Sequence, residues 1–184
     1  IKDLHCKYGY YMDSHQRDKV FDLFSDDTES VEIESTGLFL GKEGVRKFFI
    51  DNDLLEPGQT DTPGWINILI LMDQPVITID ESGTAAKGRW TTWLAEAMKC
   101  GGIPRQQWVQ GYYENEYVKE NGNWLFKKFH WNVTFYTSFE RGWLKVPLLG
   151  LLNRPDADAP APNFHPYPSG YRVPYHFAHP VTGE

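Results

Sequence analysis

The 184-residue chain has few cysteines and no cluster of basic residues. Its two cysteines, Cys6 and Cys100, cannot build the disulfide framework of a small secreted protein, so we expect a cytoplasmic location. The net charge of -7 argues against nucleic-acid binding, because phosphate contacts need clustered Lys and Arg. No apolar run approaches the ~20 residues that cross a bilayer, and the first residues do not resemble a signal peptide. We therefore expect no nucleic-acid partner and no membrane contact.

The sequence also lacks the motifs that hold metals and nucleotide cofactors. His176 and His179 are close together, but in a proline-rich stretch their spacing has no metal-binding meaning. No glycine-rich phosphate loop follows a predicted strand, and no local signature of a Ser/His/Asp triad occurs. We therefore expect neither a metal nor an organic cofactor.

The most informative segment is 107–136, which predicts one long β-hairpin. Asn121-Gly122 favours a type I′ turn, because both central residues of that turn need a positive φ. Each flanking arm is about twice the ~5–6 residue mean for a strand, and strands of that length must twist and coil. A curved sheet has a concave side, and helices that fill only part of it leave a pocket.

Helices and a short strand precede these long strands. The predicted segments are helices at 2–15, near 18–24 and from 41 onward, and strands at 30–35, 65–79 and 84–98. This order predicts an α+β domain over residues 1–140, in which a cone-shaped, curved antiparallel sheet packs on three N-terminal helices.

The composition changes after Tyr136, and from Asn153 onward proline and aromatic residues dominate. Prolines at this density exclude helix and sheet, so residues 141–184 are expected to form an extended arm. Its rings, among them Phe164 and Tyr171, are too apolar for a free linker. We expect the arm to pack on the domain or on a neighbouring subunit, in a homodimer or homotrimer.

Several polar side chains are candidates to line the pocket. Asp13 ends the first helix among apolar residues, where burial would raise its pKa as a general acid/base requires, although it could simply cap backbone amides. His130 could carry the proton instead, or be a structural histidine. Arg89 could stabilise negative charge on oxygen, or pair with Glu114 or Glu116 across the sheet.

Tyr113 and Asn115 complete the expected catalytic set. They share a strand face with Gly111, which either leaves room for a ligand or marks a bulge. The expected substrate-binding residues are Tyr10, Trp65, Lys87 and Asn132.

Over about its first three-quarters the chain resembles the SnoaL-like branch of the NTF2-like superfamily. The resemblance is carried by KYGYYMDSHQRDKVFDLFSDD, GKEGVRKFF, QPVITIDESGTAAKGRW and GYYENEYVKENGNWLFKKFHW. It implies the cone fold, but the superfamily includes dehydratases, isomerases, cyclases, dehydrochlorinases, aryl-propanoid lyases and non-catalytic proteins. In scytalone dehydratase-like members an Asp that matches Asp13 is paired with a His, whereas WINILILM on the corresponding strand contains none.

We therefore expect a cofactor-independent lyase that acts on an aromatic small molecule and releases water or formaldehyde, for example from a lignin-type aryl propanoid. Both eliminations need only acid/base groups in a dry pocket. The 15% aromatic content favours an aryl substrate. The alternatives are an isomerase or cyclase of a polyketide or steroid-like ring, and a non-catalytic ligand-binding module.

Overall fold

The computed structural model describes residues 1–33, 36–51, 68–100, 103–146, 154–165 and 169–183, so the predicted substrate-binding residue Trp65 lies outside it. The helices are α1 (Lys2–Asp13), α2 (Arg17–Phe21) and α3 (Gly41–Arg46), and α3 continues into a π-helical turn, Lys47–Asp51. The strands are β1 (Ser30–Ile33), β2 (Gly37–Leu40), β3 (Ile68–Ile79), β4 (Ala85–Cys100), β5 (Ile103–Glu120) and β6 (Asn123–Ser138).

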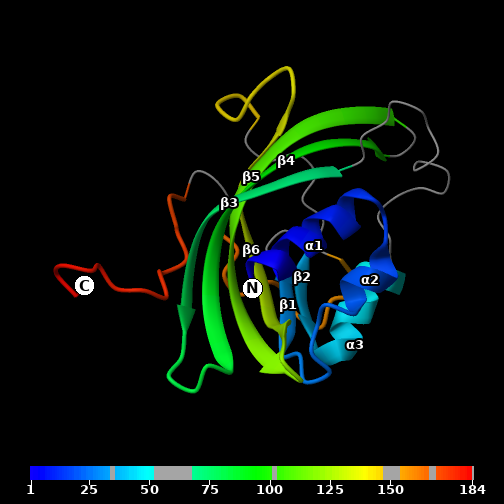
Figure 1. Cartoon of the computed structure of the whole chain (residues 1–184). Helices are drawn as coiled ribbons and strands as arrows, with labels where there is room; N and C mark the ends of the chain where they lie inside the picture. The colour runs from blue at the N-terminus through cyan, green and yellow to red at the C-terminus, as the bar shows by residue number, and fades with distance from the viewer. Residues whose placement is uncertain (34–35, 52–67, 101–102, 147–153, 166–168, 184) are drawn as a thin grey trace.

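These strands form one strongly curved sheet in the order β2-β1-β6-β5-β4-β3, and the helices lie on its concave side (Figure 1). Neighbouring strands are antiparallel except β1 and β6, which run parallel. The predicted α+β architecture, a curved sheet on N-terminal helices, is confirmed. The parallel pair and strand β2 are additions that the sequence patterns did not indicate.

The long hairpin forms around the predicted turn. Asn121 and Gly122 have φ values of 48° and 82°, the positive values that a type I′ turn requires. Farther along the hairpin, Tyr117 pairs with Phe126 but Glu116 pairs with Lys128, so one extra residue of β6 enters the ladder. Such a bulge bends the strand and shifts the register beyond it by one residue.

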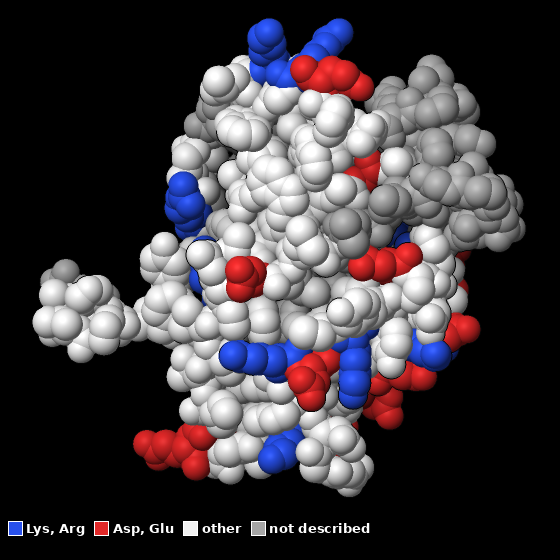
Figure 2. Space-filling view, turned by 45° about the horizontal axis from the view of Figure 1, so that its top comes forward, with Lys and Arg blue, Asp and Glu red and all other residues white. Residues whose placement is uncertain are grey.

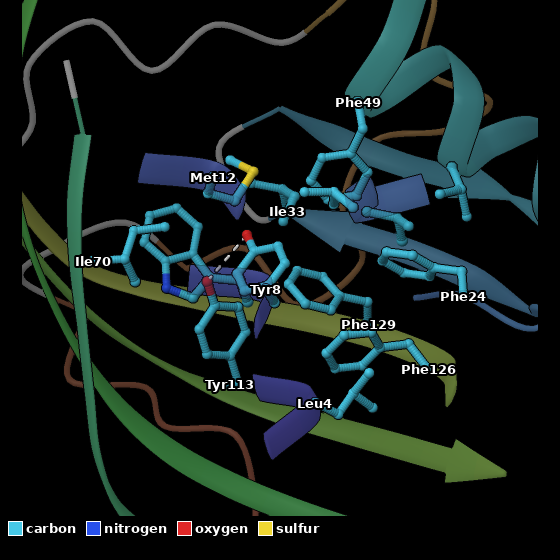
Figure 3. Packing of buried hydrophobic residues seen from close by; sticks show 14 of the residues in the cluster. Leu4, Tyr8, Met12, Phe24, Ile33, Phe49, Ile70, Tyr113, Phe126 and Phe129 are labelled. Atoms are coloured by element: carbon cyan, nitrogen blue, oxygen red, sulfur yellow. Dashed lines mark hydrogen bonds between the residues drawn. The ribbon is translucent and has the colours of Figure 1, made fainter. Parts of the chain in front are cut away.

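The core lies between α1 and the concave face and consists largely of aromatic rings (Figure 3). Tyr8 of α1 contacts Tyr113 and Phe129, with ring centroids 6.0 and 5.0 Å apart. Phe24 and Phe126 extend this packing toward the hairpin turn. The half of the concave side near the turn is therefore filled by packed rings.

The C-terminal segment returns to the domain after β6. Ala159 forms an isolated bridge with Leu38 of β2, and the Asp158 carboxylate accepts a hydrogen bond from the Leu40 N–H at 2.8 Å. Asp158 also lies 2.8 Å from the Lys47 ammonium group. The last residues project away from the domain (Figure 1).

Acidic and basic side chains are mixed over the face seen in Figure 2, and wide areas of that face carry neither. Within the described ranges, no helix has both the length and the apolar character that a membrane span needs.

Candidate functional site

The long strands distribute the predicted site residues over two faces of the sheet. Cross-strand partners point to the same side, and Tyr113 of β5 pairs with Trp90 of β4 and Trp131 of β6. Because the Tyr113 ring contacts Tyr8 of α1, this set faces the concave side. Residues one position along each strand face the convex side.

Arg89, Lys87, His130 and Asn132 lie on the convex side. Arg89 Nη1 donates a hydrogen bond to Glu114 Oε2 at 2.6 Å, which is the ion pair considered as its structural role. His130 Nε2 and Asn132 Nδ2 are 2.8 Å apart. The sheet separates these side chains from Asp13, so they do not share a pocket with it as the sequence-based hypothesis required.

The bulge in β6 explains the placement of His130. A two-residue turn with unbroken pairing would set His130 opposite Tyr113, on the concave side. The extra residue in β6 brings Trp131 to that position instead. A shift of one residue exchanges the two faces of a strand, so His130 points outward.

Asp13 ends α1 and is half-buried beside β3. Its Oδ1 accepts a hydrogen bond from the backbone N–H of Ile70 at 3.1 Å. Burial raises the pKa of the Asp13 carboxyl group, and the hydrogen bond from Ile70 opposes part of that rise. Asp13 therefore caps a strand amide, as the structural alternative proposed, and still has the raised pKa that proton transfer needs.

Glu96 of β4 is a second carboxyl group on the concave side, and the sequence reasoning missed it. Its cross-strand partner Gln107 donates a hydrogen bond from Nε2 to Glu96 Oε2 at 2.7 Å. The residue is only 5% exposed, and burial raises the pKa of its carboxyl group to about 7. The sequence did contain a signal for Glu96. It follows Thr92 and Leu94 at intervals of two residues, which places all three side chains on the inward face of the strand.

The two carboxyl groups belong to the same end of the concave side. Ile70, which binds Asp13, pairs with Leu94 of β4, and Glu96 is two residues farther along that strand. Asp13 approaches β3 from the end of α1, and Glu96 belongs to the neighbouring strand β4. Carboxyl groups whose pKa values are raised by burial are the kind of side chain that general acid/base catalysis uses.

Two tyrosine hydroxyl groups lie deeper on the same side. The Tyr113 hydroxyl donates to the Tyr8 hydroxyl at 3.4 Å, and Met12 and Ile70 lie next to the pair (Figure 3). Burial raises the pKa of Tyr8 to about 12 and raises that of Tyr113 well above its usual value. Both hydroxyl groups are therefore neutral hydrogen-bonding groups at physiological pH.

Asn115 also faces inward, but it belongs to an enclosed cluster near the hairpin turn. Its Nδ2 is 3.1 Å from His5 Nε2, and the same nitrogen of His5 is 2.6 Å from the Tyr117 hydroxyl. Asn115 Oδ1 accepts the backbone N–H of His130 at 2.8 Å. Burial lowers the pKa of His5 to about 3, so this ring is neutral. The cluster uses its hydrogen bonds internally, which indicates a structural role.

Two other features lie away from the carboxyl groups. Tyr10 is 73% exposed, so its ring lies on the outer surface of α1 and not against a pocket in the cone. A surface depression of about 470 Å³ lies at the opposite end of α1 from Asp13, and it is lined by Ile1, Lys2, Asp3, Ile77, Ile79 and Trp124. Neither feature adds a buried ionisable group.

A family model described as a SnoaL-like domain matches residues 1–130. The chain belongs to the SnoaL-like family. This match covers more than half of the chain and confirms the resemblance seen in its sequence. No curated protein matches the chain.

Several solved structures share the fold. A provisionally assigned scytalone dehydratase of Novosphingobium aromaticivorans aligns with a TM-score of 0.62 and 17% identity, over 84% of this chain and 90% of that one. The hexachlorocyclohexane dehydrochlorinase LinA-type3 of Novosphingobium barchaimii aligns at 0.60 and 16%, over 77% and 88%. A provisionally assigned aromatic ring hydroxylase of Novosphingobium aromaticivorans aligns at 0.59 and 18%, over 74% and 89%. At these identities the likeness establishes the fold.

Proposed function

We propose that this protein is a cofactor-independent lyase that eliminates a small leaving group from an aromatic molecule on the concave side of the sheet. The observation that carries the proposal is the pair of carboxyl groups, Asp13 and Glu96, whose pKa values are both raised by burial. The fold comparisons are consistent with it, since two of the similar structures are named for eliminations, a dehydration and a dehydrochlorination.

The pKa values suggest a role for each carboxyl group. Asp13 is half-buried and accepts a hydrogen bond from the Ile70 N–H that favours its charged form, so we assign it the role of the base that accepts the proton. Glu96 has a pKa of about 7 and still carries its proton just below neutrality, so it protonates the leaving group. The substrate C–H electrons form the new double bond as the carbon–oxygen bond breaks, and the hydroxyl group leaves as water.

Formaldehyde is the second leaving group that this acid and base could release. In that case Asp13 takes the proton of a hydroxymethyl group, the carbon–carbon bond breaks, and Glu96 protonates the carbon that keeps the electron pair. The rings of Tyr113 and Trp131 on the same side favour an aryl substrate, such as a lignin-type aryl propanoid.

The substitution Asp13→Asn tests the proposal. Phenolic diols and aryl-propanoid diols are incubated with the protein, and alkene absorbance and released aldehyde are measured. We expect Asp13→Asn to lower kcat by about a thousandfold, the range that general acid/base groups contribute, while the fold persists. Asp3→Asn, at an exposed position of the same helix, is the matched control and should keep the wild-type rate. Equal turnover by Asp13→Asn and wild type would contradict the proposal.

A non-catalytic binding module is the second candidate, and the solid core near the hairpin turn favours it. The buried carboxyl groups oppose it, because an unused buried carboxyl group destabilises the fold. Isomerisation or cyclisation would use Asp13 as well, but would leave the mass of the substrate unchanged, so mass spectrometry of the product distinguishes it from elimination.

We also propose that the protein is a homodimer or homotrimer. Light scattering on the full chain is the test, and a monomer with the C-terminal segment intact would contradict it.

A further inference from the structure

Two buried polar groups on the concave side have no hydrogen-bond partner among the residues that the structure describes. They are the hydroxyl group of Thr92 on β4 and the indole nitrogen of Trp131 on β6. Thr92 is 0% exposed and Trp131 6%. More than nine in ten buried polar groups in proteins are paired, so two unpaired ones on one face require an explanation.

Gly111 of β5 lies between these two groups. Thr92 is its direct cross-strand partner on β4. A Cβ atom added to Gly111 would lie 3.1 Å from Trp131 Nε1 and 2.2 Å from the carbonyl oxygen of Asn132. Cβ positions of direct partners are about 5 Å apart, so the Thr92 side chain and the Trp131 indole nitrogen flank Gly111 on the same face of the sheet. Glycine is required here, because a side chain would collide with the backbone and reach the indole nitrogen.

We propose that Thr92 and Trp131 form a subsite that binds an acceptor oxygen of the aromatic substrate. The indole N–H can only donate a hydrogen bond, so the ligand atom has to be an acceptor, such as a carbonyl or ether oxygen. The Thr92 hydroxyl donates the second bond. The aromatic nature of the ligand rests on the proposed function, whereas the oxygen subsite itself does not depend on turnover.

The subsite is positioned to orient a substrate toward the acid and base. Thr92 is two residues from Leu94, the strand partner of Ile70, which binds Asp13. Two residues of a strand span roughly 7 Å, about the length of a substituted benzene ring. An aryl ligand whose oxygen is held by Thr92 and Trp131 would therefore extend along β4 toward Leu94, one strand away from the Ile70 amide that Asp13 binds, with Val109 of β5 beside it.

The alternative occupant is a buried water molecule that joins the two donors. A matched pair of probes distinguishes it from a ligand subsite. Acetophenone carries an acceptor oxygen, and α-methylstyrene has the same shape with a methylene group in place of that oxygen. Binding is followed through the indole N–H resonances of the ¹⁵N-labelled full chain, with Trp131→Phe to assign the Trp131 signal.

We expect acetophenone to shift the Trp131 indole resonance and α-methylstyrene to leave it in place. Thr92→Val and Trp131→Phe should each weaken acetophenone binding by roughly threefold to tenfold, the usual effect of one net hydrogen bond, and leave α-methylstyrene binding unchanged. Thr91→Val is the matched control, because the Thr91 hydroxyl contacts Gln74 on the convex side.

An unmoved Trp131 resonance, equal binding of the two probes, or no acetophenone binding by wild type at about 10 mM would overturn the subsite. If Trp131→Phe fails to fold, the smaller change Thr92→Val carries the test. Selective acetophenone binding by a protein that shows no elimination would support the subsite and contradict the lyase. If the protein catalyses elimination but Thr92→Val does not change probe binding, the lyase is supported and the subsite is contradicted.

Discussion

The two faces of the central sheet differ in how their charged groups are paired. On the convex side Glu114 contacts the Arg89 guanidinium group at 2.6 Å and also the His176 ring. On the concave side Asp13 and Glu96 contact only amide N–H groups among their described hydrogen bonds. An amide satisfies a carboxyl group without holding it ionised as strongly as a cation does. Fixed ion pairs thus stabilise one face, and groups able to exchange protons occupy the other.

The convex network also holds the C-terminal segment. The backbone N–H of Val173 donates to the Tyr112 hydroxyl at 2.9 Å, and Arg89 donates to the Val173 carbonyl at 3.2 Å. Asn163 Nδ2 donates to Glu32 Oε1 at 3.2 Å. These contacts explain why polar residues are buried on the outer face of the sheet. They are the contacts expected of Arg89 in its structural alternative, an ion pair across the sheet.

A large effect on activity is expected at Glu96, the proposed general acid. We expect Glu96→Gln to lower kcat at pH 6 by about a hundredfold, because the amide has no proton to give to the leaving group. In wild type the rate should fall as the pH rises through about 7, where Glu96 loses its proton, and fall again in acid as Asp13 is protonated. A pH–rate profile checks both limbs. An alkaline limb that persists in Glu96→Gln would remove Glu96 from the mechanism.

The same substitution should stabilise the protein in alkali. Burial raises the pKa of Glu96 from 4.5 in the unfolded chain to about 7 in the fold, so the native state loses stability as the pH rises from 4.5 to 7 and does not regain it above pH 7. Glu96→Gln should therefore raise the free energy of unfolding at pH 8 by about 3 kcal/mol and leave it unchanged at pH 4. Urea denaturation at the two pH values measures this difference. Glu81→Gln, in an exposed turn, is the control, and equal shifts for both variants would contradict the burial of Glu96.

A smaller effect is expected on the convex side. Glu114→Gln weakens the contacts to Arg89 and His176, so it should lower the free energy of unfolding by about 2 kcal/mol and speed hydrogen exchange at Val173. Glu116→Gln, whose partner Lys87 is 3.7 Å away in a more exposed pair, should have little effect. We expect kcat to stay within about twofold of wild type in both variants. A large loss of activity in Glu114→Gln would mean that the convex network takes part in catalysis.

The smallest effect is expected at Thr92. Its hydroxyl group has no hydrogen-bond partner within the described part of the chain, so Thr92→Val should leave stability unchanged or raise it by about 0.5–1 kcal/mol. Thr91→Val on the other face provides the comparison. A clear loss of stability in Thr92→Val would show that the hydroxyl group has a partner in the free protein.

Local chemistry was sufficient to predict the long strands and the hairpin. The φ requirement of Asn121-Gly122 fixed the turn, and the predicted helices near 2–15 and 18–24 correspond to α1 and α2. Strand β2 was not predicted, because it has only four residues and depends on pairing with β1.

The candidate site was harder to predict, because it depends on which face each strand turns inward. Tyr113 and Asn115 were correctly predicted to share one face of the sheet. His130 and Asn132 lie on the other face because of a bulge in β6, which no turn motif in the sequence predicts. Glu96 was overlooked although its spacing from Thr92 and Leu94 marked it as inward-facing. Its raised pKa comes from burial beneath neighbouring strands, which a sequence does not display.

Comparing Asp13→Asn with His130→Gln on one substrate tests most directly whether proton transfer takes place on the concave side. Both groups were candidates for the proton carrier, and in the structure they lie on opposite sides of the sheet. We expect Asp13→Asn to lose turnover almost completely, whereas His130→Gln should keep kcat within about twofold of wild type. Loss of turnover in His130→Gln with full activity in Asp13→Asn would contradict it.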